Sequence, residues 1–234
     1  KKLVPLVRAA SQLGFSSIQL QTNGRMLAYP DVLARLVEAG VTEISPSLHG
    51  PTAEVHDELT RAPGSFDETT RGIENAVTAG LSVLTNSVIT RSNVELLAET
   101  VELLAGLGVR SAQLAFVHPV GTALEEFDEV VPRLSAVVEP LRRARGVALE
   151  HGVRLCTEAI PVCFLRGMEE LAVEACIPLT TVSDLAGRLD YSEWRVAEGK
   201  AHGPPCEACA ARPGCEGPWR EYPERRGWSE MQPL

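Results

Sequence analysis

Three cysteines near the end of the chain have the spacing of a metal site. Cys206, Cys209 and Cys215 form a C-x2-C-x5-C pattern in a stretch rich in Gly and Pro. Thiolates this closely spaced bind zinc or an iron–sulfur cluster. The segment from His202 onward has almost no aliphatic residues, and a bound metal can supply the folding free energy that a small core cannot. We therefore predict a metal or cluster site in this segment.

A closed site needs a fourth ligand. Cys163 is the first candidate, because it lies in an irregular stretch from which it can reach back. Cys156 and Cys176 are the next candidates, and His202, four residues before Cys206, leaves a zinc site open. The six cysteines could form three disulfides in a secreted protein. The first residues carry no export signal, however, and this favours a metal site.

Polar residues end several predicted strands. Thr22 and Asn23 end one strand, Ser47 ends the next, Asn86 lies late in the third and His118 follows the fourth. The carboxyl ends of parallel strands meet at one edge of a sheet, so these side chains are expected to line the same mouth. A hydroxyl in an apolar strand, as at Ser47, needs a hydrogen-bond partner. The alternative for Asn23 is a simple turn residue before glycine.

The connection from residue 49 to residue 64 is longer than the roughly 2–6 residues of a plain strand-to-helix connection, which indicates a functional loop. It contains His49 and His56, which can act in acid–base catalysis or can simply hydrogen-bond the main chain. Ser65 is expected to cap the next helix, with Glu68 completing a capping box.

The elements that position these residues follow from hydrophobic periodicity and glycine stops. Strands are expected over residues 17–21, 41–48, 81–89, 109–116 and 153–160, and helices over 3–13, 31–39, 67–79, 94–107 and 130–150. Alternating strands and helices predict an α/β fold with a parallel sheet, as in a barrel or a doubly wound sheet. Residues 1–160 are expected to form this domain and residues 161–234 a small, irregular extension. Residues 178–201 show no clean period.

Composition excludes some functions. The chain has 234 residues, of which 44% are hydrophobic and 23% charged, and its net charge is −9. This acidity argues against nucleic-acid binding, which needs a basic face. No apolar run approaches the roughly 18–20 residues that cross a bilayer. We expect a cytoplasmic protein without a membrane or nucleic-acid partner.

Two segments resemble the radical S-adenosylmethionine (SAM) superfamily: LQTNGRML and TEISPSLHGPTAEVHDELTRAPGSFDETTRGIENAVTAGLSVLTNSVITRSN. The resemblance covers residues 1 to about 120 and implies a partial (β/α) barrel. The tail CEACAARPGCEGPWREY resembles the auxiliary iron–sulfur segments of the SPASM and Twitch group. Together they imply an iron–sulfur oxidoreductase or maturase that forms a 5′-deoxyadenosyl radical, which abstracts hydrogen from a peptide or protein side chain.

The resemblance also implies roles for individual residues. Thr22 and Ser47 would contact the methionine or ribose part of SAM, with Asn23 in the same set. Asn86 would lie near the ribose or carboxylate, and the strand around Phe116 would pack on adenine. The implied metal ligands, for an auxiliary [4Fe-4S] cluster or alternatively zinc, are Cys206, Cys209, Cys215 and Cys163. An electron donor would be a further partner.

The chain departs from the superfamily at its defining motifs, and its tail has no further cysteines after the C-x2-C-x5-C, unlike SPASM domains. The C-x3-C-x2-C loop of the catalytic cluster and the Gly-Gly-Glu strand end are absent. We therefore expect a chain that is truncated at its N-terminus, lacks the first barrel units and is inactive in radical chemistry by itself. One alternative is a non-catalytic binding module with a structural zinc site. Another is a metal-independent barrel enzyme that uses His49 or His56.

Overall fold

The computed structural model describes residues 2–174 and 177–234, so the candidate ligand Cys176 lies outside the described residues. The chain divides into two compact units. Unit 1 comprises residues 1–88, 95–114 and 140–155, and unit 2 comprises residues 89–94, 115–139 and 156–234. The predicted boundary at residue 160 stays a prediction. No helix in the described ranges is long and apolar enough to span a bilayer.

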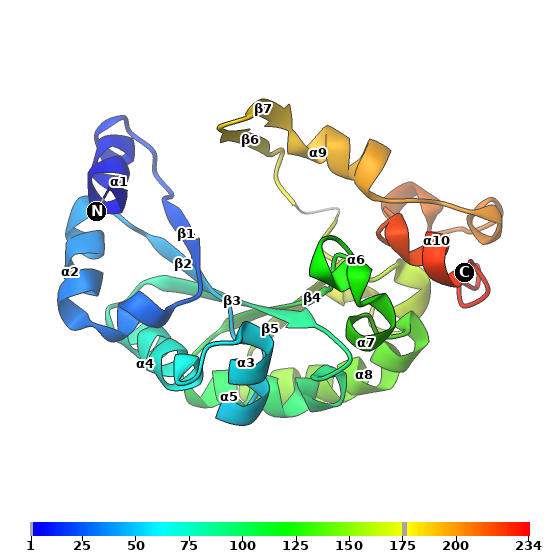
Figure 1. Cartoon of the computed structure of the whole chain (residues 1–234), viewed down its shortest axis with the longest axis horizontal. Helices are drawn as coiled ribbons and strands as arrows, with labels where there is room; N and C mark the ends of the chain where they lie inside the picture. Colours follow the sequence, from blue (N-terminus) through cyan, green and yellow to red (C-terminus); the bar gives the residue numbers. More distant parts are fainter. Residues whose placement is uncertain (1, 175–176) are drawn as a thin grey trace. The chain divides into compact units, whose positions relative to one another are not determined.

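Five strands form one sheet in sequence order, and all five were predicted. They are β1 (Gln19–Thr22), β2 (Glu43–Pro46), β3 (Ser82–Ile89), β4 (Ser111–Phe116) and β5 (Arg154–Glu158). Strands β1 and β2 pair in parallel with Gln19 opposite Glu43, and β2 pairs in parallel with β3 with Glu43 opposite Ser82. Helices connect consecutive strands (Figure 1). The predicted α/β class and partial parallel barrel are confirmed.

The main helices that precede or connect the strands lie where hydrophobic periodicity predicts them. They are α1 (Leu3–Gln12), α2 (Pro30–Ala39), α4 (Ser65–Thr78), α5 (Leu97–Gly106) and α8 (Leu134–His151). Two short helices, α6 (Thr122–Glu125) and α7 (Phe127–Val130), precede α8 and shorten the helix expected from residue 130. The cause is local, because Pro132 cannot continue a helix from α7 into α8.

The connection from residue 49 to residue 64 is not an irregular loop. It contains helix α3 (Ala53–Thr60), whose N-cap is Thr52, with the Val55 N–H donating to Thr52 Oγ1 at 3.5 Å. Only His56 of this helix is buried. The helix therefore lacks the apolar stripe that periodicity detects.

The predicted capping box at Ser65 is wrong. Gly64, with a φ of 82°, is the N-cap of α4, and Ser65 is the first helical residue. The Ser65 hydroxyl instead donates to Asp57 Oδ1 at 2.9 Å. A carboxylate from α3 therefore does the capping that the sequence pattern assigned to a local serine.

Strand β3 alternates strictly between buried and partly exposed residues. Val83, Thr85, Ser87 and Ile89 are buried. Asn86 lies on the opposite face of the strand, because successive side chains of a strand point to opposite faces. This alternation directs the Asn86 amide away from the buried face.

The last part of unit 2 is mostly short elements: two 3-10 turns (Val162–Phe164 and Glu169–Leu171), the hairpin β6 (Thr181–Asp184) and β7 (Gly187–Asp190), α9 (Tyr191–Trp194), a π turn (Arg195–Gly199), two further 3-10 turns (Pro204–Cys206 and Arg212–Gly214) and α10 (Glu221–Arg226). The hairpin falls in the stretch without a period. All its strand residues are exposed, so no buried face imposes an alternating pattern.

Candidate functional site

A polar cavity of about 270 Å³ lies in unit 1, beside the carboxyl ends of β1 and β2. Its lining includes Asn23, Arg25, Ser47, His49, His56 and Ser65. These residues come from the turn after β1, the end of β2, helix α3 and the start of α4. The cavity therefore brings together Asn23 and Ser47, two of the residues predicted from strand ends.

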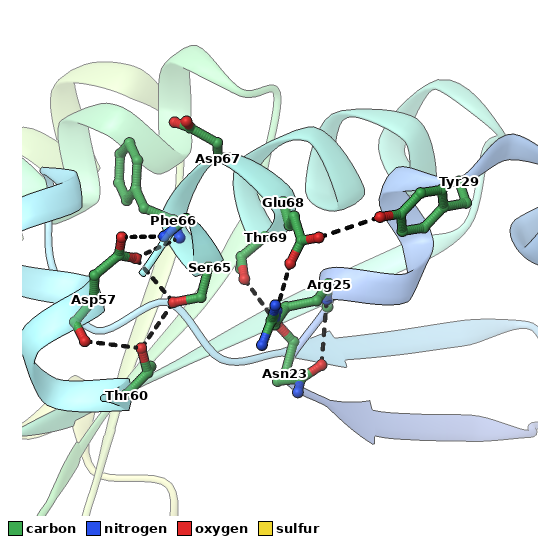
Figure 2. Close-up of polar contacts among 12 residues, drawn as sticks. Asn23, Arg25, Tyr29, Asp57, Thr60, Ser65, Phe66, Asp67, Glu68 and Thr69 are labelled. Carbon is green, nitrogen blue, oxygen red and sulfur yellow. Dashed lines mark hydrogen bonds and ion pairs between the residues drawn. The ribbon is translucent and has the colours of Figure 1, made fainter. Parts of the chain in front are cut away.

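Arg25 is held at the edge of the polar cavity by a carboxylate from α4. The Arg25 Nε and Glu68 Oε2 atoms are 2.5 Å apart, and the Tyr29 hydroxyl donates to Glu68 Oε1 at 3.2 Å (Figure 2). The hydrogen bond from Arg25 holds the pKa of Glu68 below its ordinary value. Glu68 therefore stays ionised and fixes a guanidinium with donors left over.

Helix α4 packs against the turn after β1 through two glycines. Gly24 has a φ of 76°, which glycine adopts without strain. A Cβ on Gly72 would lie 2.3 Å from the Gly24 carbonyl oxygen. The Thr69 hydroxyl donates to the Asn23 carbonyl oxygen at 2.9 Å. These contacts fix the position of the Asn23 turn relative to α4.

Asp57 organises the other side of the cavity (Figure 2). Its Oδ1 accepts from Phe66 N at 2.8 Å, and its Oδ2 accepts from Gly64 N at 2.6 Å. Burial raises the pKa of Asp57, but the hydrogen bonds from Phe66, Gly64 and Ser65 outweigh burial, and the net pKa is lowered. The ionised carboxylate satisfies N–H groups at the start of α4 that have no partner within the helix.

His49 stacks on His56 of helix α3, and their ring centres are 5.8 Å apart. His49 Nδ1 accepts from Val88 N at 3.2 Å, and His56 Nδ1 accepts from His49 N at 3.1 Å. Burial and the neighbouring His56 lower the pKa of His49 to about 4, and burial also lowers that of His56. Both rings are therefore neutral at pH 7 and hydrogen-bond the main chain, which argues against acid–base catalysis by this pair.

Ser47, which directly follows β2, and Asn86, which lies within β3, are partners in a parallel bridge. The Ser47 N–H donates to the Thr22 carbonyl oxygen at 3.0 Å, and the Leu48 N–H donates to that of Asn86 at 3.3 Å. Within the described ranges, Asn86 Oδ1 is buried without a hydrogen-bond partner. A buried acceptor without a partner lowers the stability of the folded protein unless a ligand or water molecule hydrogen-bonds to it.

Thr22 and Phe116 do not line the polar cavity. Thr22 Oγ1 accepts from Gly24 N at 3.2 Å, and Thr22 lines a separate cavity of about 520 Å³ whose lining is mainly apolar. Phe116 belongs to unit 2, where it is buried, contacts Tyr222 edge-on at 5.7 Å and accepts from Trp219 Nε1 through its carbonyl oxygen at 3.4 Å. His118, also in unit 2, stacks on Trp219 with ring centres 3.8 Å apart.

Unit 2 contains a cysteine cavity, which we define by the four thiols that line it: Cys163, Cys206, Cys209 and Cys215. Its volume is about 20 Å³, and His202 is also in its lining. The cavity brings together the four residues predicted as metal ligands. Cys156 is not in the lining.

The environment of the cysteine cavity suits thiolates that share a cation. Burial and the nearby Cys215 raise the pKa of Cys163 to about 11, and burial raises that of Cys215. The main-chain N–H of Leu234 donates to Cys209 Sγ at 3.5 Å and lowers the pKa of Cys209. A bound cation reverses the effects of burial and mutual repulsion, because it favours the thiolate form. The residues present therefore fit a thiolate-bound metal group.

The positions of the four thiols help to distinguish a single zinc ion from an iron–sulfur cluster as the bound group. Within the described ranges, no three His, Cys, Asp or Glu side chains form a group that could hold a single metal ion as they stand. His202 Nε2 is 2.8 Å from the Cys215 carbonyl oxygen, so this ring nitrogen already has a partner. Zinc requires ligand atoms that converge to about 2.3 Å from one ion. A cluster spreads its irons, and thiols that are further apart can reach it.

Sequence reasoning missed a set of buried charges next to the cysteine cavity. Glu216, which follows Cys215, accepts from Arg195 Nη2 at 2.7 Å, and Lys200 Nζ lies 4.1 Å from the centre of a Trp219 ring. Arg195 and Lys200 are each at most 5% exposed. Burial lowers the pKa of Lys200. Their partners are distant in sequence, so no local pattern could have identified them.

Comparison with known proteins shows a similarity to one family over the first part of the chain. Residues 1–104 match the model described as "Radical SAM superfamily". The chain is 33% identical over 138 residues to an AdoMet-dependent heme synthase from Oleidesulfovibrio alaskensis, covering 55% of this chain and 35% of that protein. It is also 33% identical over 145 residues to a probable GTP 3′,8-cyclase from Saccharolobus islandicus, covering 58% of this chain and 46% of that protein. The chain therefore spans less than half the length of these relatives.

A solved structure supports the fold. A domain of pyruvate-formate lyase-activating enzyme from Bacteroides vulgatus superposes with a TM-score of 0.52 at 14% identity, covering 66% of this chain and 88% of that one. At this identity the likeness concerns the fold alone. The family match covers β1–β3 and the polar cavity that they form with α3 and α4. Residues 1–104 are therefore similar to the Radical SAM superfamily over the part of the chain that builds β1–β3 and the polar cavity.

Proposed function

We propose that this chain binds SAM at the polar cavity and an auxiliary [4Fe-4S] cluster at the cysteine cavity, as part of a radical SAM enzyme that modifies a peptide or protein side chain. The observation that carries the proposal is the pairing of Ser47, which lines the polar cavity, with Asn86 on the neighbouring strand. It places an amide oxygen that has no hydrogen-bond partner among the described residues next to a hydroxyl, near the carboxyl ends of adjacent parallel strands, where α/β proteins bind ligands.

The chemistry of the polar cavity matches the polar groups of SAM. SAM carries a carboxylate, an ammonium group and two ribose hydroxyls. Asn86 Oδ1 can accept from the ammonium group or a hydroxyl, and Ser47 can donate and accept. Arg25 has donors beyond the one that meets Glu68, and these suit a carboxylate. A cavity of about 270 Å³ is at the small end for ligand sites, so we assign it the methionine part of SAM.

The polar cavity and the cysteine cavity would each contribute only part of what the radical reaction needs. Bound to a reduced catalytic cluster, SAM supplies the 5′-deoxyadenosyl radical. The six cysteines of this chain include no C-x3-C-x2-C spacing, so the ligands of that cluster are not among these residues. The residues described here would bind and orient SAM and exclude water from it. Four thiols, of which Cys209 accepts from the main-chain N–H of Leu234, would hold the auxiliary cluster.

Two observations bear on the substrate class, and they favour different substrates. The tail resembles segments found in enzymes that modify peptides, and this favours a peptide or protein. The relatives are named for heme synthesis and for GTP cyclisation, and these names favour a small molecule. Fold alone does not decide between them. Binding of labelled peptide libraries, GTP and heme precursors to the reconstituted protein would separate the candidates.

SAM binding is tested by isothermal titration calorimetry on the whole chain. We expect saturable binding of SAM that is weakened about tenfold by Ser47→Ala, because one hydrogen bond to a charged ligand contributes about 1.5 kcal/mol. Ser17→Ala, which removes an exposed hydroxyl bonded to Glu43, is the matched control and should leave the affinity unchanged. Equal affinities in all three proteins would reject the assignment of the polar cavity.

The cluster is tested by anaerobic reconstitution with iron and sulfide, followed by metal analysis and Mössbauer spectroscopy. We expect about four irons per chain, lost in Cys206→Ala and retained in Cys156→Ala, because Cys156 does not line the cysteine cavity. Stoichiometric zinc without iron, together with absent SAM binding, would instead support the non-catalytic module with a structural zinc site.

A further inference from the structure

A second cavity in unit 2, which we call the arginine cavity, is lined by three arginines and only one acidic residue. Its volume is about 310 Å³, and the charged residues in its lining are Arg91, Arg133, Arg226 and Asp128. Arg91 follows β3, Arg133 precedes α8 and Arg226 ends α10. The net charge of the chain is −9. Such a concentration of guanidinium groups on an acidic chain needs an explanation, and nothing in the proposed SAM or cluster chemistry uses it.

Arg226 is held in a fixed position at this arginine cavity. Its Nη2 is 3.2 Å from Asp128 Oδ1 and 3.3 Å from the Val131 carbonyl oxygen, and its guanidinium lies 5.1 Å from the centre of the Phe127 ring. The side chain is only 15% exposed. In the part of the chain that the structure describes, Arg226 Nε is buried without a hydrogen-bond partner. Arg226 is therefore rigid and has an unused donor.

The other two arginines complete the cavity in different ways. Arg91 Nη1 donates to the Asp128 carbonyl oxygen, which brings its guanidinium to the same residue that pairs with Arg226. Arg133 is 59% exposed, and its Nη1 is 3.9 Å from Glu230 Oε2. That carboxylate already accepts from the hydroxyls of Tyr222 and Ser135. Arg133 is thus weakly held and can turn towards a ligand.

From this arrangement we infer that the arginine cavity is a binding site for the phosphate group of a small molecule. One guanidinium satisfies a carboxylate with two parallel bonds, whereas a phosphate has more acceptor oxygens and up to two charges and is bound by several arginines. The remaining lining is apolar, namely Val94, Val131, Pro132 and Ala136, and can contact the uncharged part of the ligand. The inference is independent of the SAM and cluster proposals.

The test is titration calorimetry of the whole chain with three probes: inorganic phosphate, pyrophosphate and citrate. We expect pyrophosphate to bind most tightly and citrate most weakly. Arg133→Gln should weaken pyrophosphate binding about tenfold, as expected for the loss of one charge-assisted contact, without unfolding the protein, because Arg133 is exposed. Arg225→Gln is the matched control. Arg225 is the neighbour of Arg226 on α10, lies 6.0 Å from the same Phe127 ring and does not line the cavity.

A second variant separates a binding role from a structural one. Asp128→Asn removes the only negative charge of the lining and keeps an oxygen for Arg226, so it should tighten pyrophosphate binding several-fold. If Asp128 only stabilises the fold, the Asp128→Asn variant should be less stable than the wild type and should bind pyrophosphate no more tightly. The inference fails if neither phosphate nor pyrophosphate binds, if Arg225→Gln weakens binding as much as Arg133→Gln, or if citrate binds as tightly as pyrophosphate.

Discussion

Ser47 at the end of β2 and Asn86 in β3 face each other across a parallel bridge, and the Asn86 side-chain oxygen has no hydrogen-bond partner among the residues that the structure describes. An acceptor of this kind lowers the stability of the ligand-free protein. Ser47 lines the polar cavity, and we expect a ligand bound there to donate a hydrogen bond to the Asn86 oxygen.

Asn86→Ala should weaken SAM binding about tenfold and leave the free energy of unfolding unchanged or slightly raised. The substitution removes a buried oxygen that costs about 1–3 kcal/mol when unsatisfied, although it also leaves a small cavity. Calorimetry and urea denaturation on the same protein measure the two quantities. A variant that loses stability but keeps its SAM affinity would mean that Asn86 is structural.

Asp57→Asn should lower the midpoint of thermal unfolding at pH 7, because the carboxylate caps α4 through Gly64 and Phe66. The folded-state pKa of Asp57 is lowered, so its contribution is present above the unfolded-state pKa and disappears as the pH falls through the folded-state value. The difference between wild type and variant should therefore vanish in acid.

The matched control for Asp57 is Asp67→Asn. Asp67 lies in the first turn of the same helix, is exposed and points away from the Asp57 contacts (Figure 2). Its interaction with the helix dipole is weaker than the hydrogen bonds that Asp57 accepts, and we expect a smaller change in the unfolding midpoint. Equal changes in the two variants would contradict the capping role of Asp57.

His49 should make the protein less stable in mild acid. Its pKa is about 4 in the folded protein, below the ordinary value of 6.5, so the unfolded state takes up the proton first as the pH falls. Its contribution is fully present above pH 6.5 and is lost progressively towards pH 4. Between pH 7 and pH 5 the loss is about 2 kcal/mol.

Urea denaturation at both pH values measures this loss in the wild type, in His49→Gln and in a His151→Gln control. His49→Gln should show a smaller loss between the two pH values than the wild type. His151 ends α8 and is exposed, so its variant should behave like the wild type. An unchanged pH dependence in His49→Gln would show that His49 is not buried as a neutral ring.

Gly72→Ala should destabilise the protein by about 1–3 kcal/mol, even though alanine is the better helix former by about 1 kcal/mol. The new methyl group would lie 2.3 Å from the Gly24 carbonyl oxygen and force α4 away from the Asn23 turn. SAM affinity should fall with stability, because this contact positions one wall of the polar cavity.

Gly146→Ala is the opposite case within another helix, α8. A Cβ on Gly146 meets no atom within 4 Å, so the substitution should stabilise the protein by up to about 1 kcal/mol. Urea denaturation of both variants checks the pair. Similar shifts in the same direction would contradict the close packing of α4 on the turn after β1.

The sequence by itself determined the alternation of strands and helices. All five strands and the main helices lie close to their predicted positions, because buried faces impose periods of 2 and 3.6 residues on the chain. It also made Ser47, Asn86 and the closely spaced cysteines candidate site residues, because strand ends and closely spaced thiols are local features. Helix α3 and the hairpin β6–β7 were missed, since neither has the buried face that produces a period.

Only the tertiary structure decided which side chains meet. In the structure Cys163 lines the same cavity as Cys206, Cys209 and Cys215. Thr22 lines a different cavity from Ser47, and Arg25 forms an ion pair with Glu68. The arginine cavity combines residues more than 130 positions apart. The physical reason is that contacts between distant residues depend on how helices and strands pack, and packing leaves no periodic trace in the sequence around either partner.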